Sequence, residues 1–297
     1  MKKITKKIWL TTAILLLVAT IAGADEVDQA LSDVAPQAVV QSTRELIESG
    51  LASDRAIALT RAMVQHRFGA QQIEEAHRVL QKARNQNLPS DPIINKAFEG
   101  MAKGVQASRI VGAMDAVRER YDFAHRQALQ LTGRKSHLNQ MGHIIAAGLA
   151  AGLTPHSVES IISGLQERSR TMNTDQREAL ALETFKTARD MARLGVSPSQ
   201  IAPLLGQALR HQFSASQMHN LRTAFRNGSR KSDPRSLAVQ YGRSIEQGKS
   251  FEGPGGGNAG EGAGSTGGAG SGPGGSEGDG SDGSGPGGGN GRGGSGG

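Results

Sequence analysis

Apolar residues recur every three or four positions through most of the chain between residues 25 and 251, with polar and charged residues between them. This spacing places the apolar residues on one face of an α-helix, which a protein buries against neighbouring elements. Alternating runs of β-branched residues, which are typical of strands, are missing from the same region. We therefore predict an all-α body with helices of about 12–20 residues. The clearest stripes are Ile73, Ala76, Leu80 and Ala83; Ile93, Ile94, Ala97, Phe98, Met101 and Ala102; Ile110, Met114, Val117, Tyr121, Ala124, Ala128 and Leu131; Val158, Ile161, Ile162 and Leu165; and Ile201, Leu204, Leu205 and Ala208.

Short segments that begin with glycine separate several of these stripes, and two of them share one pattern. Residues 152–155 read Gly-Leu-Thr-Pro and residues 195–198 read Gly-Val-Ser-Pro. Glycine can end a helix in the left-handed conformation, which other residues adopt at a cost. Thr or Ser can then cap the next helix, and Pro suits its first position. Weaker versions of the pattern begin at Gly50 and Gly104.

The spacing of these four glycines indicates a repeat. They lie 43 to 54 residues apart, and a unit of roughly 45 residues that holds two helices has the size of a helical-hairpin repeat. The predicted fold class is therefore all-α, with irregular helical-hairpin repeats that form either an α-solenoid-like stack or a multi-helix bundle with short connections. Further breaks between helices are expected at Gly69, Asn87, Asn173 and Ser214.

The N-terminus has the features of a secretory signal peptide. Four lysines within residues 2–7 precede an uncharged, largely apolar stretch at residues 8–21, and Ala22-Gly23-Ala24 offers the small residues that signal peptidase reads. Cleavage between Ala24 and Asp25 would place the protein in the periplasm or outside the cell. The alternative is an uncleaved helix that anchors the chain in a membrane. No other stretch is apolar enough to cross a bilayer, so we expect no transmembrane segment in the mature chain.

The C-terminal segment differs sharply in composition from the body. Residues 253–297 hold 25 of the chain's 41 glycines, and residues 252–297 hold no apolar side chain larger than alanine except proline. Such a segment cannot bury a core and is expected to be disordered. The predicted organisation is thus a signal peptide at residues 1–24, a helical body at 25–251 and a disordered Gly/Ser-rich tail at 252–297.

Most signatures of catalysis and of metal binding are missing from the sequence. The chain has no cysteine, which excludes a disulfide scaffold, a zinc ribbon and a cysteine nucleophile. Its eight histidines include no pair at the four-residue spacing of a helical metal site, and the body shows no phosphate-binding loop and no serine-hydrolase motif. We therefore predict no catalytic residues, no metal and no cofactor.

The charge of the body is positive and concentrated towards its C-terminal end. The whole chain has a formal net charge of +7, of which residues 25–252 carry +6, and most cations there are arginines. Arginine suits carboxylates and phosphates because its guanidinium is a planar fork of donors. Aromatic residues that could stack on bases, such as Phe225 and Tyr241, are few in this region, which argues against a nucleic-acid ligand. The candidate anion-binding residues are Arg210, Arg222, Arg226, Arg230, Lys231, Arg235 and Arg243.

Three functions are consistent with these observations. The first is an exported, non-catalytic helical-repeat protein that acts as an interaction or scaffold protein of the cell envelope, with an unknown protein or envelope polymer as partner. The alternative is a binder of an anionic polymer or anionic lipid through the region from Arg210 to Arg243. The second alternative is an enzyme whose site is assembled from scattered polar residues.

The signal-peptide hypothesis predicts that the mature protein begins at Asp25. N-terminal sequencing of the exported protein should therefore read from Asp25, because the small residues before it are those that signal peptidase accepts. A chain that keeps Met1 and stays in the membrane fraction would contradict cleavage and support the anchor.

Overall fold

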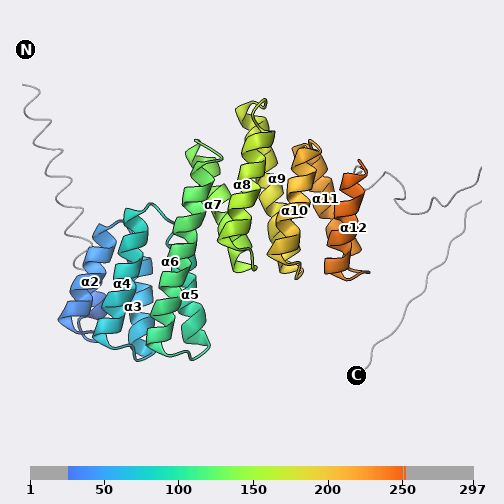
Figure 1. The fold of residues 1–297 in the computed structure, drawn as a ribbon. Coiled ribbons are helices and arrows are strands. Elements are labelled where there is room, and N and C mark those ends of the chain that lie inside the picture. Colours follow the sequence, from blue (N-terminus) through green and yellow to red (C-terminus); the bar gives the residue numbers. More distant parts are fainter. Residues whose placement is uncertain (1–25, 250, 252–297) are drawn as a thin grey trace, which may run out of the picture. The chain divides into compact units, whose positions relative to one another are not determined.

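The computed structural model describes residues 26–249 and residue 251, and these residues are folded almost entirely into α-helices (Figure 1). No strand occurs among them, so the predicted all-α class is confirmed. The predicted cleavage site at Ala24 and Asp25 and the predicted tail at 252–297 lie outside the described residues. After a helical segment at residues 26–31, the helices are α2 (Gln37–Glu48), α3 (Ser53–Gln65), α4 (Ala70–Asn85), α5 (Asp91–Ala102), α6 (Ala107–Leu129), α7 (Lys135–Ala150), α8 (Pro155–Arg168), α9 (Thr174–Arg193), α10 (Pro198–Arg210), α11 (Ala215–Gly228) and α12 (Pro234–Glu246).

Most helices pack on the helix two places further along the chain. Helices α2, α4 and α6 lie in one row and α3 packs on α5; beyond α6, one row is formed by α7, α9 and α11 and the other by α8, α10 and α12. This pairing is that of stacked helical hairpins in two layers. Helix α6 departs from this pairing, because it also packs extensively on both of its sequence neighbours, α5 and α7 (Figure 1).

The predicted repeat of two helices per unit is wrong for the first interval. Between Gly50 and Gly104 the chain forms three helices, α3 to α5, because the breaks predicted at Gly69 and Asn87 are both present. Gly69 precedes α4, and Asn87 follows it with a φ of 55°. The break between α6 and α7, at residues 130–134, was not predicted, because it lacks the glycine-cap-proline pattern of the other connections.

The glycines that were predicted to end helices do adopt the left-handed conformation. The φ angle is 97° at Gly50, 64° at Gly104, 115° at Gly152 and 87° at Gly195. After Gly152, the backbone N–H of Leu153 donates to the carbonyl of Gly148 at 3.0 Å, and the Leu153 side chain is buried against the helix that has just ended.

The caps that follow these glycines differ from one another. The Thr154 hydroxyl accepts a hydrogen bond from the backbone N–H of Ser157 at 3.1 Å, as the sequence predicted. Ser197, which was predicted to do the same for α10, makes no such bond. Its hydroxyl instead contacts the side chains of Ser199 and Gln200, at 2.9 and 3.0 Å.

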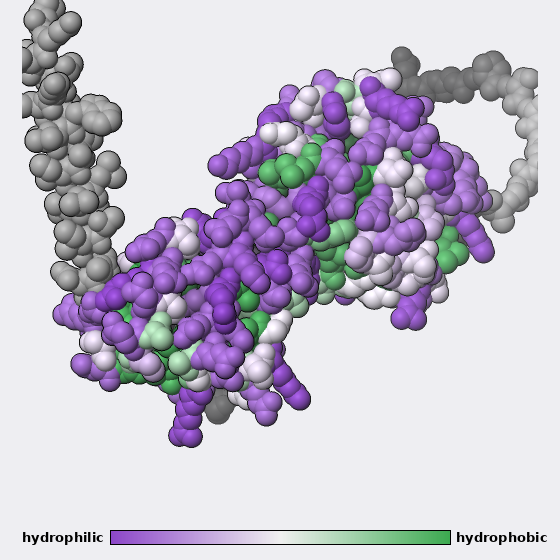
Figure 2. All heavy atoms as spheres, turned by 60° about the vertical axis from the view of Figure 1, so that its left-hand side comes forward, coloured by the Kyte–Doolittle hydropathy of each residue, from purple (hydrophilic) through white to green (hydrophobic). Residues whose placement is uncertain are grey.

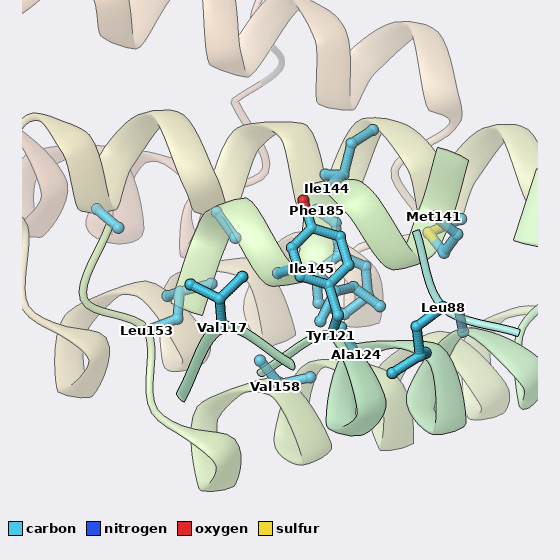
Figure 3. Packing of buried hydrophobic residues seen from close by; sticks show 14 of the residues in the cluster. Leu88, Val117, Tyr121, Ala124, Met141, Ile144, Ile145, Leu153, Val158 and Phe185 are labelled. Carbon is cyan, nitrogen blue, oxygen red and sulfur yellow. The ribbon is translucent and has the colours of Figure 1, made fainter. Parts of the chain in front are cut away.

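The apolar stripes form a core that runs through the stacked helices, whereas the face drawn in Figure 2 is covered mainly by hydrophilic residues. The residues predicted to be buried are buried in nearly every case, and one continuous cluster extends from α2 to α12. Figure 3 shows this packing where α6, with Val117 and Tyr121, meets Ile145 of α7 and Phe185 of α9. Phe98 is an exception, because 39% of its surface stays exposed.

Aromatic side chains cover the last helix of the stack. Phe251 lies with its ring centroid 4.7 Å from that of Tyr241 and 6.4 Å from that of Phe213. Tyr241 also meets Phe225 of α11 edge to face at 5.8 Å. These contacts attach the segment after α12 to α12 itself and to the α10–α11 connection. Among all the residues that the structure describes, no helix is long and apolar enough to cross a membrane.

Replacing Gly152 and Gly112 by alanine should change stability in opposite directions. A Cβ would meet open space at both positions, so only the backbone conformation differs. Gly152 has a φ of 115°, and alanine there should lower the free energy of unfolding by at least about 1 kcal/mol.

Gly112 is the matched control, because it lies exposed inside α6 with helical geometry. Alanine there should raise the free energy of unfolding by up to about 1 kcal/mol. Urea unfolding of both variants measures the two changes, and a shift of equal sign would contradict the conformational explanation.

Candidate functional site

The structure divides the seven predicted anion-binding residues between the two layers of helices. Arg222 and Arg226 lie on α11, with Arg230 and Lys231 directly after it, whereas the other three belong to α10 and α12 of the opposite layer. The seven residues therefore come from both layers and do not share one helix face. Neighbours in sequence are separated here because consecutive helices alternate between the layers.

Three of these seven residues, Arg222, Arg235 and Arg210, lie outside the groove described below and contact other parts of the structure. Arg222 forms an ion pair with Glu183 of α9 at 3.0 Å and has a side chain only 14% exposed. Arg235 donates from its Nε to the carbonyl oxygen of Gly195 at 3.3 Å, which connects the start of α12 to the end of α9. Arg210 lies beside Arg168 in a groove of about 730 Å³ between α8 and α10.

The Arg222 ion pair belongs to a small polar cluster between α9 and α11. Glu183 is also 2.7 Å from the Nζ of Lys186 and 3.3 Å from the Nδ1 of His219. Burial on its own raises the pKa of Glu183, but the hydrogen bond from Lys186 and the charge of Arg222 outweigh burial and hold that pKa below its usual value. The carboxylate thus holds Arg222 in the interface between helices, and Arg222 is not available to a ligand.

Arg226 and Arg230 do come together with other arginines. With Arg189 and Arg193 of α9 they line a groove of about 450 Å³ between α9 and α11, which we call the arginine groove. Its complete lining is Arg189, Asp190, Arg193, Leu194, Arg226, Ser229 and Arg230. Sequence reasoning missed the two arginines of α9.

A sequence signal for the missed pair exists. Arg189 and Arg193 are four residues apart, as are Arg226 and Arg230, and the second pair follows the first by 37 residues. Each pair precedes a helix that begins with proline, α10 or α12. Because α9 and α11 are equivalent helices of neighbouring hairpins, the stacking places the two pairs side by side.

The arginine groove carries excess positive charge. Four guanidinium groups face one carboxylate, Asp190, which accepts from Arg189 at 2.7 Å. Helices α9 and α11 both end at the groove, and each helix end contributes roughly half a negative charge. About two positive charges remain uncompensated after these contributions. In the described part of the chain, no carboxylate lies within ion-pair distance of Arg193, Arg226 or Arg230.

A buried carboxylate lies at the junction of α6, α7 and α9. Glu178 has a side chain only 5% exposed and accepts hydrogen bonds from Thr132 and from Nδ1 of His137, both at 2.5 Å, with Arg134 at 3.1 Å. Burial on its own raises the pKa of Glu178, but the hydrogen bonds from Thr132 and His137 and the charge of Arg134 hold it below its usual value. These partners occupy both carboxylate oxygens, so Glu178 fastens the α6–α7 connection to α9.

A second buried polar cluster lies between α2, α3 and α4. His77 is 1% exposed; its Nε2 lies 3.0 Å from the hydroxyl of Thr60 and its Nδ1 lies 2.8 Å from that of Ser42. Burial lowers the pKa of His77 to about 4, so the ring is neutral near pH 7. A histidine paired with a serine can activate a nucleophile, but this ring is enclosed by the core, so we assign the cluster a structural role.

The comparisons with known proteins add no functional assignment. No protein-family model matches this chain, and no curated protein matches it. Within the described helices and connections, no group of three or more His, Asp or Glu side chains is placed to hold a metal ion. We take the arginine groove as the candidate site because four arginines from two hairpins converge on it.

The neutral His77 makes stability depend on pH in a defined direction. Its pKa is about 4 in the folded chain and 6.5 when exposed, so the unfolded chain binds more protons between these values. The contribution of His77 to the free energy of unfolding should therefore be constant above about pH 6.5. It should fall by about 3 kcal/mol as the pH drops to 4, because the unfolded chain binds a proton that the folded chain does not.

Urea unfolding at pH 7, 5.5 and 4 measures this loss in the wild type and in a His77→Gln variant. The variant keeps hydrogen-bonding atoms but cannot titrate, so its stability should fall less over the same range. A His156→Gln control, at an exposed position, should keep the wild-type dependence. Equal pH dependence in the wild type and His77→Gln would contradict the assignment.

Proposed function

We propose that this chain is an exported, non-catalytic helical-repeat protein of the cell envelope that binds an anionic polymer along the arginine groove. The observation that carries the proposal is the convergence of Arg189, Arg193, Arg226 and Arg230 from two stacked hairpins on one groove with excess positive charge. The basic head and the small residues at the predicted cleavage site support the location outside the cytoplasm.

The geometry favours an extended ligand with repeated charges. Arg189 and Arg193, four residues apart on α9, are separated by about 6 Å along its axis, and neighbouring helices lie about 8–10 Å apart. The groove therefore presents guanidinium groups from α9 and from the C-terminal end of α11. A polymer with phosphate, sulfate or carboxylate groups at similar spacing can contact both sets, and each guanidinium can donate two hydrogen bonds to one such group.

The chemistry of the groove favours binding over catalysis. Arginine stays protonated at any physiological pH, so it cannot exchange protons with a substrate. The carboxylate of Asp190 is already held by Arg189, and the remaining polar residue in the lining is Ser229. The seven lining residues thus lack an available general base, which an enzyme of this site would need.

A polymer fits the groove better than a lipid surface does. Stable attachment to a membrane combines positive charge with an apolar surface that enters the bilayer. Leu194, 37% exposed, is the one apolar side chain in the lining. Charge alone therefore has to supply the affinity, and it does so more effectively in a groove than on a flat surface because the low-dielectric walls concentrate the field.

Reversing the charge of the groove should abolish binding to an anionic polymer. An Arg226→Glu, Arg230→Glu double variant changes two exposed side chains and should elute from immobilised heparin at much lower salt than the wild type. The matched control is Arg109→Glu, Arg170→Glu, which makes the same change of net charge at exposed positions outside the groove. Melting temperatures of both variants test whether the fold is kept.

The outcomes separate the groove from general electrostatics and from lipid binding. The proposal predicts that the control elutes with the wild type or close to it. If both double variants lose heparin binding equally, net charge and not the groove is responsible. The wild type could also bind phosphatidylglycerol vesicles more tightly than heparin, and the groove variant could lose that binding. This result would show that the ligand of the groove is an anionic lipid and not a polymer.

A further inference from the structure

A separate polar cavity lies where the α4–α5 connection meets α6 and α7. Its volume is about 400 Å³, which is in the range of small-molecule sites. Figure 3 shows two of its walls, Tyr121 on α6 and Leu88 in the connection. The cavity is lined by Arg84, Asn87, Leu88, Pro89, Tyr121, His125, Asn139 and His143.

The lining is rich in hydrogen-bond donors and has no carboxylate. It offers one guanidinium, two imidazoles, one phenol and two carboxamides, and none of the eight residues is acidic. Such a set of groups complements an anion, because each of these side chains can donate a hydrogen bond to an oxygen of a carboxylate or phosphate.

One donor of this set lacks a partner. The Nε2 of His125 is buried and makes no hydrogen bond. Unsatisfied buried nitrogens are rare in native proteins, and a site for a ligand is one of the reasons they persist. Gly142 of α7 lies against the same ring, and a Cβ there would come within 3.0 Å of the His125 Cδ2. Glycine inside a helix costs about 1 kcal/mol relative to alanine, so this close approach is maintained at a cost.

Arg84 supplies the positive charge of the cavity, and a neutral carbonyl group, not a carboxylate, holds its side chain in place. The Nε of Arg84 donates to the carbonyl oxygen of Ser49 at 3.3 Å. Its guanidinium lies over Gly50, where a Cβ would be only 2.6 Å from the Nη2 of Arg84. No carboxylate of the described residues lies within ion-pair distance of Arg84. The α2–α3 turn therefore holds the guanidinium in place through a neutral group and leaves its charge uncompensated.

Two further polar groups of the cavity, Tyr121 on α6 and His143 on α7, hold each other in position. The hydroxyl of Tyr121 lies 2.9 Å from the Nδ1 of His143. Burial raises the pKa of Tyr121, so the phenol keeps its proton near pH 7. Whichever of the two groups donates in this bond, the Tyr121–His143 pair retains one N–H or O–H for a ligand. Asn139 precedes His143 by one turn of α7 and lines the same cavity.

We propose that this cavity binds a small organic anion through a carboxylate or phosphate group, with Arg84 supplying the charge and His125 and one member of the Tyr121–His143 pair supplying hydrogen bonds. The inference is independent of the arginine groove, because the two sites share no residue. It gives this helical-repeat protein a second, small-molecule ligand beside the polymer proposed above.

Long-range ¹H–¹⁵N spectra of the histidine rings test the proposal in the full chain. Sodium phosphate and sodium citrate are the two anionic probes, sodium chloride of equal ionic strength is the salt control and glycerol is the uncharged control. We expect saturable shifts of His125 and His143 with phosphate or citrate, and none of comparable size at the exposed His66 and His156. The probe that binds more tightly identifies the group that the cavity prefers.

Variants assign the binding to the cavity. Arg84→Gln should weaken probe binding about tenfold or more, because it removes a charged hydrogen-bond donor. Arg78→Gln, at an exposed position of the same helix outside the lining, should leave binding unchanged. Asn139→Leu, at an exposed position of α7, provides a second test should Arg84→Gln disturb the α2–α3 turn, and it should also weaken binding.

Two results would overturn the proposal. One is a set of histidine shifts that is equal in phosphate, citrate and chloride, and the other is wild-type binding in both Arg84→Gln and Asn139→Leu. The Arg226→Glu, Arg230→Glu variant must keep the shifts of His125 and His143. If it loses them, the probes report on the arginine groove and not on the cavity.

Discussion

The burial of one apolar stripe per helix is the constraint on which the rest of this structure depends. A helix with a single apolar face cannot cover that face alone, so each helix here packs on the helix two places along the chain. The chain thereby builds two layers with a continuous core between them. At the C-terminal end of the described stack, Phe251 packs on Tyr241 of α12 and on Phe213 of the α10–α11 connection.

The same core encloses polar groups that stabilise the stack through hydrogen bonds and ion pairs, in addition to the burial of apolar surface. Thr60 and Ser42 satisfy both ring nitrogens of His77, and Thr132, His137 and Arg134 surround the carboxylate of Glu178. Groups buried in this way are stable only in one arrangement, because an unpaired polar atom in a core is costly. The clusters therefore fix how α2 packs on α4 and how the α6–α7 connection lies on α9.

Stacking also explains why the candidate sites lie where they do. Equivalent positions of neighbouring hairpins lie side by side, so two arginines on α9 and two at the end of α11 form a groove although 37 residues separate the pairs. The cavity around His125 forms at the other special place, where α6 packs directly on α7 and the regular pairing of helices is interrupted. Repetition thus produces the groove, and the interruption of the repetition produces the cavity.

The sequence by itself determined the all-α class, most buried positions and the left-handed helix ends at Gly50, Gly104, Gly152 and Gly195. These features depend on local periodicity and on backbone conformations that only glycine adopts readily. The tertiary structure alone decided which charges meet. Arg210 and Arg243 do not line the groove with Arg226, Arg222 is paired with Glu183, and Arg189 joins the groove, because consecutive helices alternate between layers and every second helix packs together. The His125 cavity gave no sequence signal, since its residues come from three helices and a connection and meet only through packing.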